Sequence, residues 1–155
     1  LVWFVAWGAR LARRRLPASP YVANYGANTV SVIDTASNTG VATVPVEGGA
    51  RGVAVTPNGK HAYVTNWGSA TVSVIDTASN TVVVTVPLGG EAAGVAITPD
   101  GSHANVAGGP SEFWGIPQLP HRKNLGSVTV IATASNTVVA TVTVGSNPLG
   151  VGIMP

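Results

Sequence analysis

Hydrophobic and polar residues alternate in short runs along most of this chain, and the runs return at a fixed spacing. Residues 71–75 and 81–86 are typical, because valine alternates there with serine or threonine. Such alternation predicts half-buried β-strands. Residues 21–62 and 63–104 align without a gap at an offset of 42 residues, and 29 of the 42 aligned positions are identical. We therefore predict a repeat protein made of strands.

Each repeat predicts four short strands joined by short connections. By position within the unit, they are represented by residues 94–98, 61–65, 71–75 and 81–86. Segments 99–101 (Pro-Asp-Gly) and 76–80 (Asp-Thr-Ala-Ser-Asn) have typical turn chemistry. Short connections make the four strands an antiparallel meander. A meander that recurs about every 40 residues is typical of the blades of a β-propeller.

The third repeat is interrupted. It begins at Asn105 and resumes at Val128, where the offset from the second repeat becomes 56, so about 14 residues have been inserted. We expect segment 109–124 to be a loop, because it holds Pro110, Pro117 and Pro120. The repeat domain covers residues 20–155, about three blades, with a twelfth strand expected at 150–154. Propellers typically have four to eight blades, so we expect one chain to form an incomplete ring.

Residues 1–19 do not align with the repeat. An apolar run is followed there by Arg10 and by the arginines at 13–15. The run is too short to span a bilayer, and the charges follow it, whereas a signal peptide carries them in front. Three interpretations stay open: a truncated or mis-started end, a membrane-surface or targeting remnant, and a short helix packed on the body. We expect residues 1–15 to be dispensable for the blade fold, because they align with no repeat.

The motif at 63–66 (Tyr-Val-Thr-Asn), followed by segments 71–76, 81–86 and 94–101, resembles the YVTN-type β-propeller repeat. The resemblance covers residues 21–155. It implies propeller blades like those of archaeal surface-layer proteins, of bacterial exported propellers and of lactonase-type propellers, and it favours an extracytoplasmic or cell-surface location. The third repeat departs from the motif, since Asn-Val-Ala-Gly stands at 105–108 and alanine at 132.

Charge excludes one class of partner. The chain has a net charge of +2, but four of its eight basic residues lie ahead of Leu16. From Leu16 onward, four basic residues face six acidic ones, so the repeat body has a charge of −2. This balance argues against nucleic-acid binding. The chain contains no cysteine, which excludes disulfides, thiolate catalysis and cysteine-ligated metal.

Few residues have a catalytic pattern. Asp34 and Asp76 both open the same turn, where aspartate caps backbone N–H groups, so we interpret them as turn residues. His61 and His103 recur in register, as structural residues do. A metal site from His103, Glu112 and His121 matches no known ligand spacing. No catalytic residues, metal site or cofactor are predicted.

Variable loops gather on one side of the predicted blades. In a meander the turns 34–38, 57–59, 76–80 and 99–101 share one edge of the sheets, and the remaining connections share the other. The second edge varies between repeats, and variable loops on a rigid scaffold often bind ligands. Our candidate binding residues are Tyr25, Arg51, Asn66, Trp67, Glu91, Trp114 and His121. The alternative for Tyr25 and Trp67 is that they only cover the blade edge.

These features favour a non-catalytic propeller acting as a binding or interaction scaffold, with an unknown ligand. Two alternatives stay open, a lactonase-like enzyme and a non-functional fragment of a longer propeller protein. Three stacked blades leave two uncovered faces rich in valine, and such faces associate. We therefore expect self-association, most simply a dimer that completes a six-bladed ring, or further propeller blades as partners.

Overall fold

The computed structural model describes residues 19–109 and 125–154, which form eleven β-strands and no helix. The strands are β1 (Tyr21–Asn24), β2 (Thr29–Asp34), β3 (Thr39–Pro45), β4 (Ala50–Val55), β5 (His61–Asn66), β6 (Thr71–Asp76), β7 (Thr81–Pro87), β8 (Glu91–Ile97), β9 (His103–Gly109), β10 (Gly126–Ala132) and β11 (Thr137–Val144). Segments 1–18 and 110–124 lie outside the described residues, and so do the predictions for the N-terminal segment and for most of the insertion.

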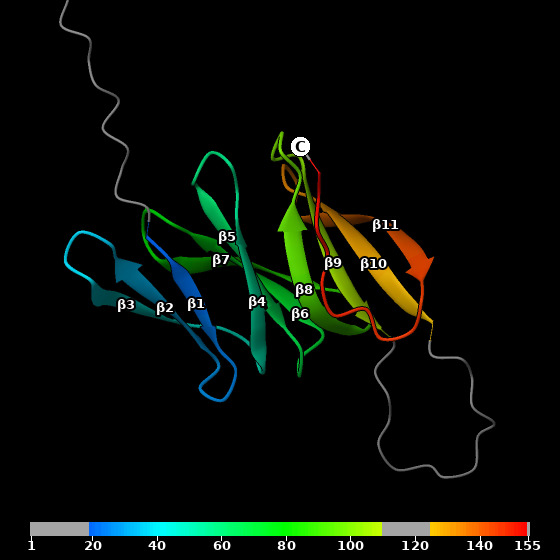
Figure 1. The fold of residues 1–155 in the computed structure, drawn as a ribbon, viewed down its shortest axis with the longest axis horizontal. Helices are drawn as coiled ribbons and strands as arrows, with labels where there is room; N and C mark the ends of the chain where they lie inside the picture. The colour runs from blue at the N-terminus through cyan, green and yellow to red at the C-terminus, as the bar shows by residue number, and fades with distance from the viewer. Residues whose placement is uncertain (1–18, 110–124, 155) are drawn as a thin grey trace, which may run out of the picture.

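The strands form three sheets that stand side by side (Figure 1). Strands β1–β3 make blade 1, β4–β7 make blade 2 and β8–β11 make blade 3, and every neighbouring pair within a blade is antiparallel. This confirms the predicted all-β fold of propeller blades in meander order, arranged in an arc that does not close. Within the described residues, no helix is long and apolar enough to cross a membrane.

The prediction of a twelfth strand at 150–154 is wrong, because no strand forms there. The segment nevertheless lies where the repeat predicts it, beside β8. A Cβ atom on Gly52 of β4 would lie 2.7 Å from the Ala93 carbonyl oxygen of β8, and one on Gly94 of β8 would lie 2.6 Å from the Leu149 carbonyl oxygen. The C-terminal segment thus lies against β8 as β8 lies against β4. Among the described residues no strand pairs with this segment, so it does not form a regular strand.

Two apolar clusters lie between the blades. The cluster between blades 1 and 2 contains Val30, Val32, Val44, Ala50, Ala62, Val64 and Ile75. The cluster between blades 2 and 3 contains Tyr63, Val72, Val74, Val86, Ala92, Ala104, Val106 and Ile131. Strand β5 of the middle blade is buried on both faces, whereas β2 of blade 1 alternates between buried and half-buried positions. The core of this fold is therefore the stacking of one blade on the next.

The tyrosine of the repeated motif ties neighbouring blades together. The Tyr21 hydroxyl of blade 1 donates to Asn80 Oδ1 of blade 2 over 2.8 Å, and the Tyr63 hydroxyl of blade 2 donates to Asn136 Oδ1 of blade 3 over 2.5 Å. Asn80 and Asn136 both have a φ of 53°, a conformation that asparagine tolerates. Burial raises the pKa of Tyr63, so this hydroxyl keeps its proton.

The aspartates that open the turns cap the backbone, as predicted. The Asp76 carboxylate accepts hydrogen bonds from the Ser79 amide (2.8 Å), the Ser79 hydroxyl (2.9 Å) and the Ala78 amide (3.0 Å). Asp34 accepts the same set from Ala36 and Ser37. These bonds favour the charged form of each carboxylate and lower its pKa, led by the Ser79 amide for Asp76 and by the Ser37 hydroxyl for Asp34.

We expect stability to fall as the medium is acidified below about pH 4. Hydrogen bonds from the Thr98 hydroxyl and from Ser102 lower the pKa of Asp100 from 3.8 to about 2. A carboxyl whose pKa is lower in the folded state stabilises the fold fully above its unfolded pKa, and this contribution is lost as the pH falls through the folded pKa. The loss for Asp100 therefore lies between about pH 4 and pH 2.

Urea unfolding at a series of pH values measures this loss. The variant Asp100→Asn copies Asn58, its counterpart in the preceding repeat, and should show a shallower fall below pH 4 than the parent protein. An unchanged slope in that variant would contradict the assignment of the turn carboxylate.

Candidate functional site

Three loops meet at the edge of the sheets opposite the aspartate turns. Gly48 and Gly49, which connect blade 1 to blade 2, lie at their centre. The Gly48 amide donates to Ser69 Oγ over 2.7 Å, the Gly49 amide donates to Asn28 Oδ1 over 2.8 Å, and the Trp67 amide donates to the Gly49 carbonyl over 2.8 Å. These bonds join the β1–β2, β3–β4 and β5–β6 connections, which we call together the loop edge.

Three of the predicted binding residues gather on the loop edge. The Arg51 guanidinium carbon lies 4.3 Å from the centroid of a Trp67 ring, which is cation–π geometry. Tyr25 is 58% exposed, and its Cε2 atom would lie 3.3 Å from a Cβ atom on Gly49. Two aromatic rings and one positive charge thus lie beside the Gly48–Gly49 backbone, which is fixed by hydrogen bonds to the neighbouring loops.

Asn66 has a different environment. Its side chain is fully buried, and Nδ2 donates to Thr71 Oγ1 over 3.0 Å and to Ser73 Oγ over 2.9 Å. Asn24 makes the same pair of bonds in blade 1, to Thr29 over 3.1 Å and to Ser31 over 2.9 Å. Asn66 therefore fastens the second strand of its blade to the third, beneath the loop edge, and its role in binding stays a prediction.

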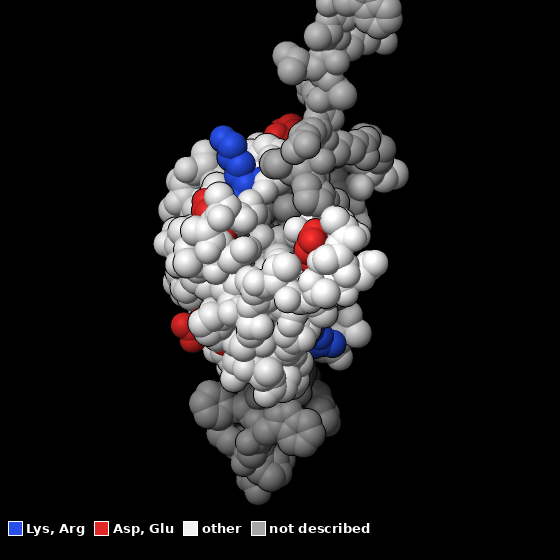
Figure 2. Space-filling model, turned by 90° about the vertical axis from the view of Figure 1, so that its left-hand side faces the viewer, with Lys and Arg blue, Asp and Glu red and all other residues white. Residues whose placement is uncertain are grey.

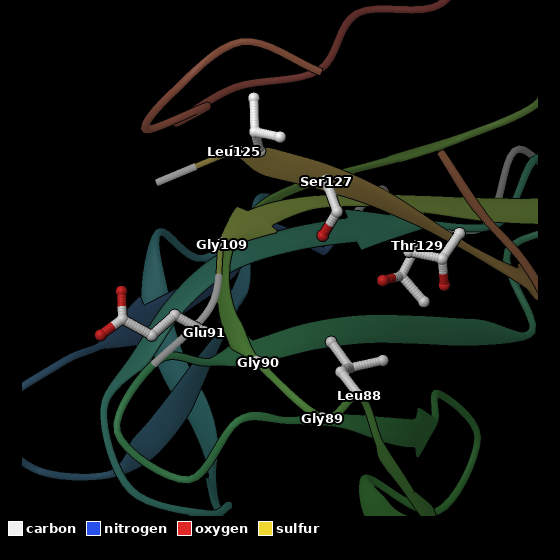
Figure 3. A pocket seen from close by; sticks show the side chains of 9 residues that line it. Leu88, Gly89, Gly90, Glu91, Gly109, Leu125, Ser127 and Thr129 are labelled. Atoms are coloured by element: carbon white, nitrogen blue, oxygen red, sulfur yellow. The ribbon is translucent and has the colours of Figure 1, made fainter. Parts of the chain in front are cut away.

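Glu91 lies one blade further along the loop edge and lines a cavity of about 270 Å³ between the β7–β8 connection and blade 3 (Figure 3). The cavity is lined by Leu88, Gly89, Gly90, Glu91, Gly109, Leu125, Ser127, Thr129 and Thr141. This cavity was not predicted from the sequence. The available signal was that Gly108 replaces the asparagine found at positions 24 and 66.

The other predicted residues lie elsewhere. Trp114 and His121 lie outside the described residues, as does Glu112. His61 and His103 begin β5 and β9 at the turn edge, where His103 Nδ1 lies 2.7 Å from Ser102 Oγ. Across residues 19–109 and 125–154, no group of three or more His, Asp or Glu side chains is arranged to hold a metal ion.

Comparison with known proteins places the fold. No protein-family model matches the chain, and no curated protein matches its sequence. Among solved structures, the chain is similar to the Kuenenia stuttgartiensis hydrazine synthase, with 27% identity and a TM-score of 0.70 over 84% of this chain and 36% of that one. It is also similar to the dihydro-heme d1 dehydrogenase NirN in complex with DHE, with 17% identity and a TM-score of 0.63 over 81% of this chain and 25% of that one.

Both neighbours are β-propeller proteins, and this chain spans only about a third and a quarter of their lengths. Each is named for an enzymatic activity, but a propeller is a scaffold on which different functions are placed. The chain is thus an all-β protein of partial propeller type.

Proposed function

We propose that this chain is a non-catalytic, YVTN-type β-propeller scaffold that binds a ligand or partner through its loop edge. One observation carries the proposal, namely the contrast between the two edges of the blades. At the turn edge, the aspartate and serine side chains form their hydrogen bonds within their own turns, and Asn80 and Asn136 accept hydrogen bonds from tyrosines of the neighbouring blades. At the loop edge, Tyr25, Arg51 and Trp67 present aromatic and charged groups on a hub fixed by hydrogen bonds.

The residue types at the loop edge suit recognition. Tyrosine, tryptophan and arginine are enriched among residues that dominate binding energy, because each combines a large contact area with a polar group. Stacking of Arg51 on Trp67 also pre-orders two long side chains, which lowers the entropy lost when a ligand binds. The cluster therefore favours ligands that offer an aromatic or sugar face together with an acceptor or a negative charge.

Glycan and peptide arrays test this proposal. The double variant Arg51→Ala, Trp67→Gly copies the residues at 93 and 109 in the third repeat, so the fold should accept it. We expect at least one ligand class to bind the parent protein saturably, and its affinity to fall about tenfold or more in the variant, the effect of losing about 1.4 kcal/mol of binding energy.

The matched control is Lys60→Ser, which copies Ser102 of the next repeat and removes one positive charge at the turn edge. Binding should be unchanged in this control. The proposal would be overturned if no ligand class bound, or if the control lost as much affinity as the loop-edge variant.

The partner we propose for the two ends of the arc is a second copy of this chain. Side chains that pack blade 1 on blade 2 include Val30, Val32 and Val44, and their counterparts on blade 3 are Val128, Val130 and Val142. These three are half-buried or exposed, and Val142 is 53% exposed. On blade 2, the residues that pack against them include Val64 and Ile75. The counterparts of these two on blade 1 are Val22, which is exposed, and Ile33, which is half-buried.

The two open faces therefore match each other as the inner faces do. Figure 2 views the molecule from the side of blade 1 and shows only scattered charged side chains there, so little charge opposes association. Among the described residues, no strand of blade 1 precedes β1, and segment 149–150 lies against β8 as β8 lies against β4. In a two-fold arrangement, each copy can supply that segment to the other and close six blades.

The proposed location is extracytoplasmic or at the cell surface, and it rests on the resemblance to YVTN-type repeats. Fractionation of cells that express the full-length protein decides the location, and recovery in the cytoplasmic fraction alone would contradict it.

A further inference from the structure

The cavity between the β7–β8 connection and blade 3 lies next to a position where the third repeat lacks one side chain. In blade 2, Asn66 pairs with Thr71 across the β5–β6 ladder, and its amide fills the space above the Thr71 and Ser73 hydroxyls. In blade 3, Gly108 pairs with Ser127 at the same point of the ladder. Gly108 offers no amide, so the counterpart hydroxyls, those of Ser127 and Thr129, line a cavity instead.

The missing side chain cannot return without a change in the backbone. A Cβ atom on Gly108 would lie 1.8 Å from the carbonyl oxygen of Glu91, closer than two such atoms can approach. The connection from blade 2 to blade 3 has therefore moved into the space beside Gly108. In this blade the strand pairing begins at Glu91 and Gly109, one residue earlier than the pairing of Ala50 with Asn66 in blade 2. The cavity is a built feature of blade 3.

The walls define the chemistry of an occupant. Figure 3 shows the Ser127 and Thr129 side chains on one wall and Leu88 across from them. Among the described residues, neither hydroxyl forms a hydrogen bond, and Thr129 is only 6% exposed. A volume of about 270 Å³ lies just below the usual range for drug-sized ligands, so it suits a small molecule or a single side chain.

We propose that this cavity binds a primary carboxamide, either a small amide or the side chain of asparagine or glutamine in a peptide. The two sister blades show the interaction directly, since an amide NH₂ donates to both hydroxyls of the pair at 2.9–3.1 Å. The same pair, with serine and threonine exchanged, stands in the same places of the ladder in blade 3. Leu88 offers an apolar wall for the carbon atoms.

Acetamide is the probe, followed by backbone amide chemical shifts of the full chain. We expect saturable shifts confined to residues around 88–91 and 126–129. N,N-dimethylacetamide has no N–H group and should produce no saturable shift, and acetate, which has no N–H to donate to the two hydroxyls, should bind more weakly than acetamide. The double variant Ser127→Ala, Thr129→Val removes both hydroxyls and should weaken acetamide binding about tenfold, the effect of two lost hydrogen bonds. Thr85→Val is the control, because Thr85 does not line the cavity.

The proposal is overturned if acetamide gives no saturable shift, if the dimethyl compound acts equally, or if the double variant binds like the parent. If the double variant unfolds, the comparison of the three probes on the parent protein still decides. This inference deepens the proposed scaffold function by naming a ligand group at the same edge. Its failure is distinguishable, because the variants of Arg51 and Trp67 should leave acetamide binding unchanged.

Discussion

Replacing Ile75 by alanine is expected to lower the free energy of unfolding by about 2–5 kcal/mol, the usual cost of truncating a fully buried isoleucine. Ile75 has no exposed surface and lies in the apolar cluster between blades 1 and 2. Its neighbours belong to two rigid sheets, so they collapse little into the space left behind. Because the core of this protein is the contact between blades, the lost free energy of unfolding should reflect weaker packing of one blade on the next.

Urea denaturation measures the effect, with Val83→Ala as the control. Val83 lies on β7 and is 51% exposed, so its truncation should change the free energy of unfolding by well under 1 kcal/mol. Equal losses at the two positions would mean that the blades are stable without their stacking.

Adding a single methyl group at Gly52 is expected to cost about 1–3 kcal/mol, the usual range for an overpacked contact. The new Cβ atom of Gly52→Ala would lie 2.7 Å from the Ala93 carbonyl oxygen and 3.0 Å from the Thr65 hydroxyl oxygen. Thr65 Oγ1 already joins both strands, since it accepts from the Gly52 amide and donates to the Ala93 carbonyl, each over 2.7 Å. The methyl group therefore separates β4 from β8 and breaks this bridge.

Gly40→Ala is the matched control, because no atom lies within 4 Å of the position its Cβ would take. The melting temperature should fall by several degrees in Gly52→Ala and change little in Gly40→Ala. A melting temperature of Gly52→Ala equal to that of the parent would show that β4 and β8 are not in close contact in solution.

Much of the fold could be predicted from the sequence because the same strand pattern recurs in three repeats. Alternating valines gave the strands, and the capping by Asp34 and Asp76 followed from the turn composition. The prediction of a strand at 150–154 was wrong because a strand needs a pairing partner as well as a suitable sequence. No local pattern reports whether that partner is present.

The candidate site could be predicted only in part. The order of a meander placed Tyr25, Arg51 and Trp67 at one edge, and the structure brings them together. The meander order could not reveal that Asn66 is buried, because an asparagine at the end of a strand is usually a surface residue. The cavity beside Gly108 depends on where the Glu91 carbonyl lies, and that position is set by the packing of blade 2 on blade 3.

Sedimentation equilibrium of this 155-residue chain tests the central claim, that these blades form an arc closed by a second copy, most directly. One chain has a mass of 15.6 kDa, so the six-bladed ring predicts a single species of about twice that mass. The variant Ile33→Lys places a charge on the uncovered face of blade 1 and should shift the mass toward that of one chain. A parent protein that sediments as a stable monomer, or as a mixture of large aggregates, would contradict the closed ring.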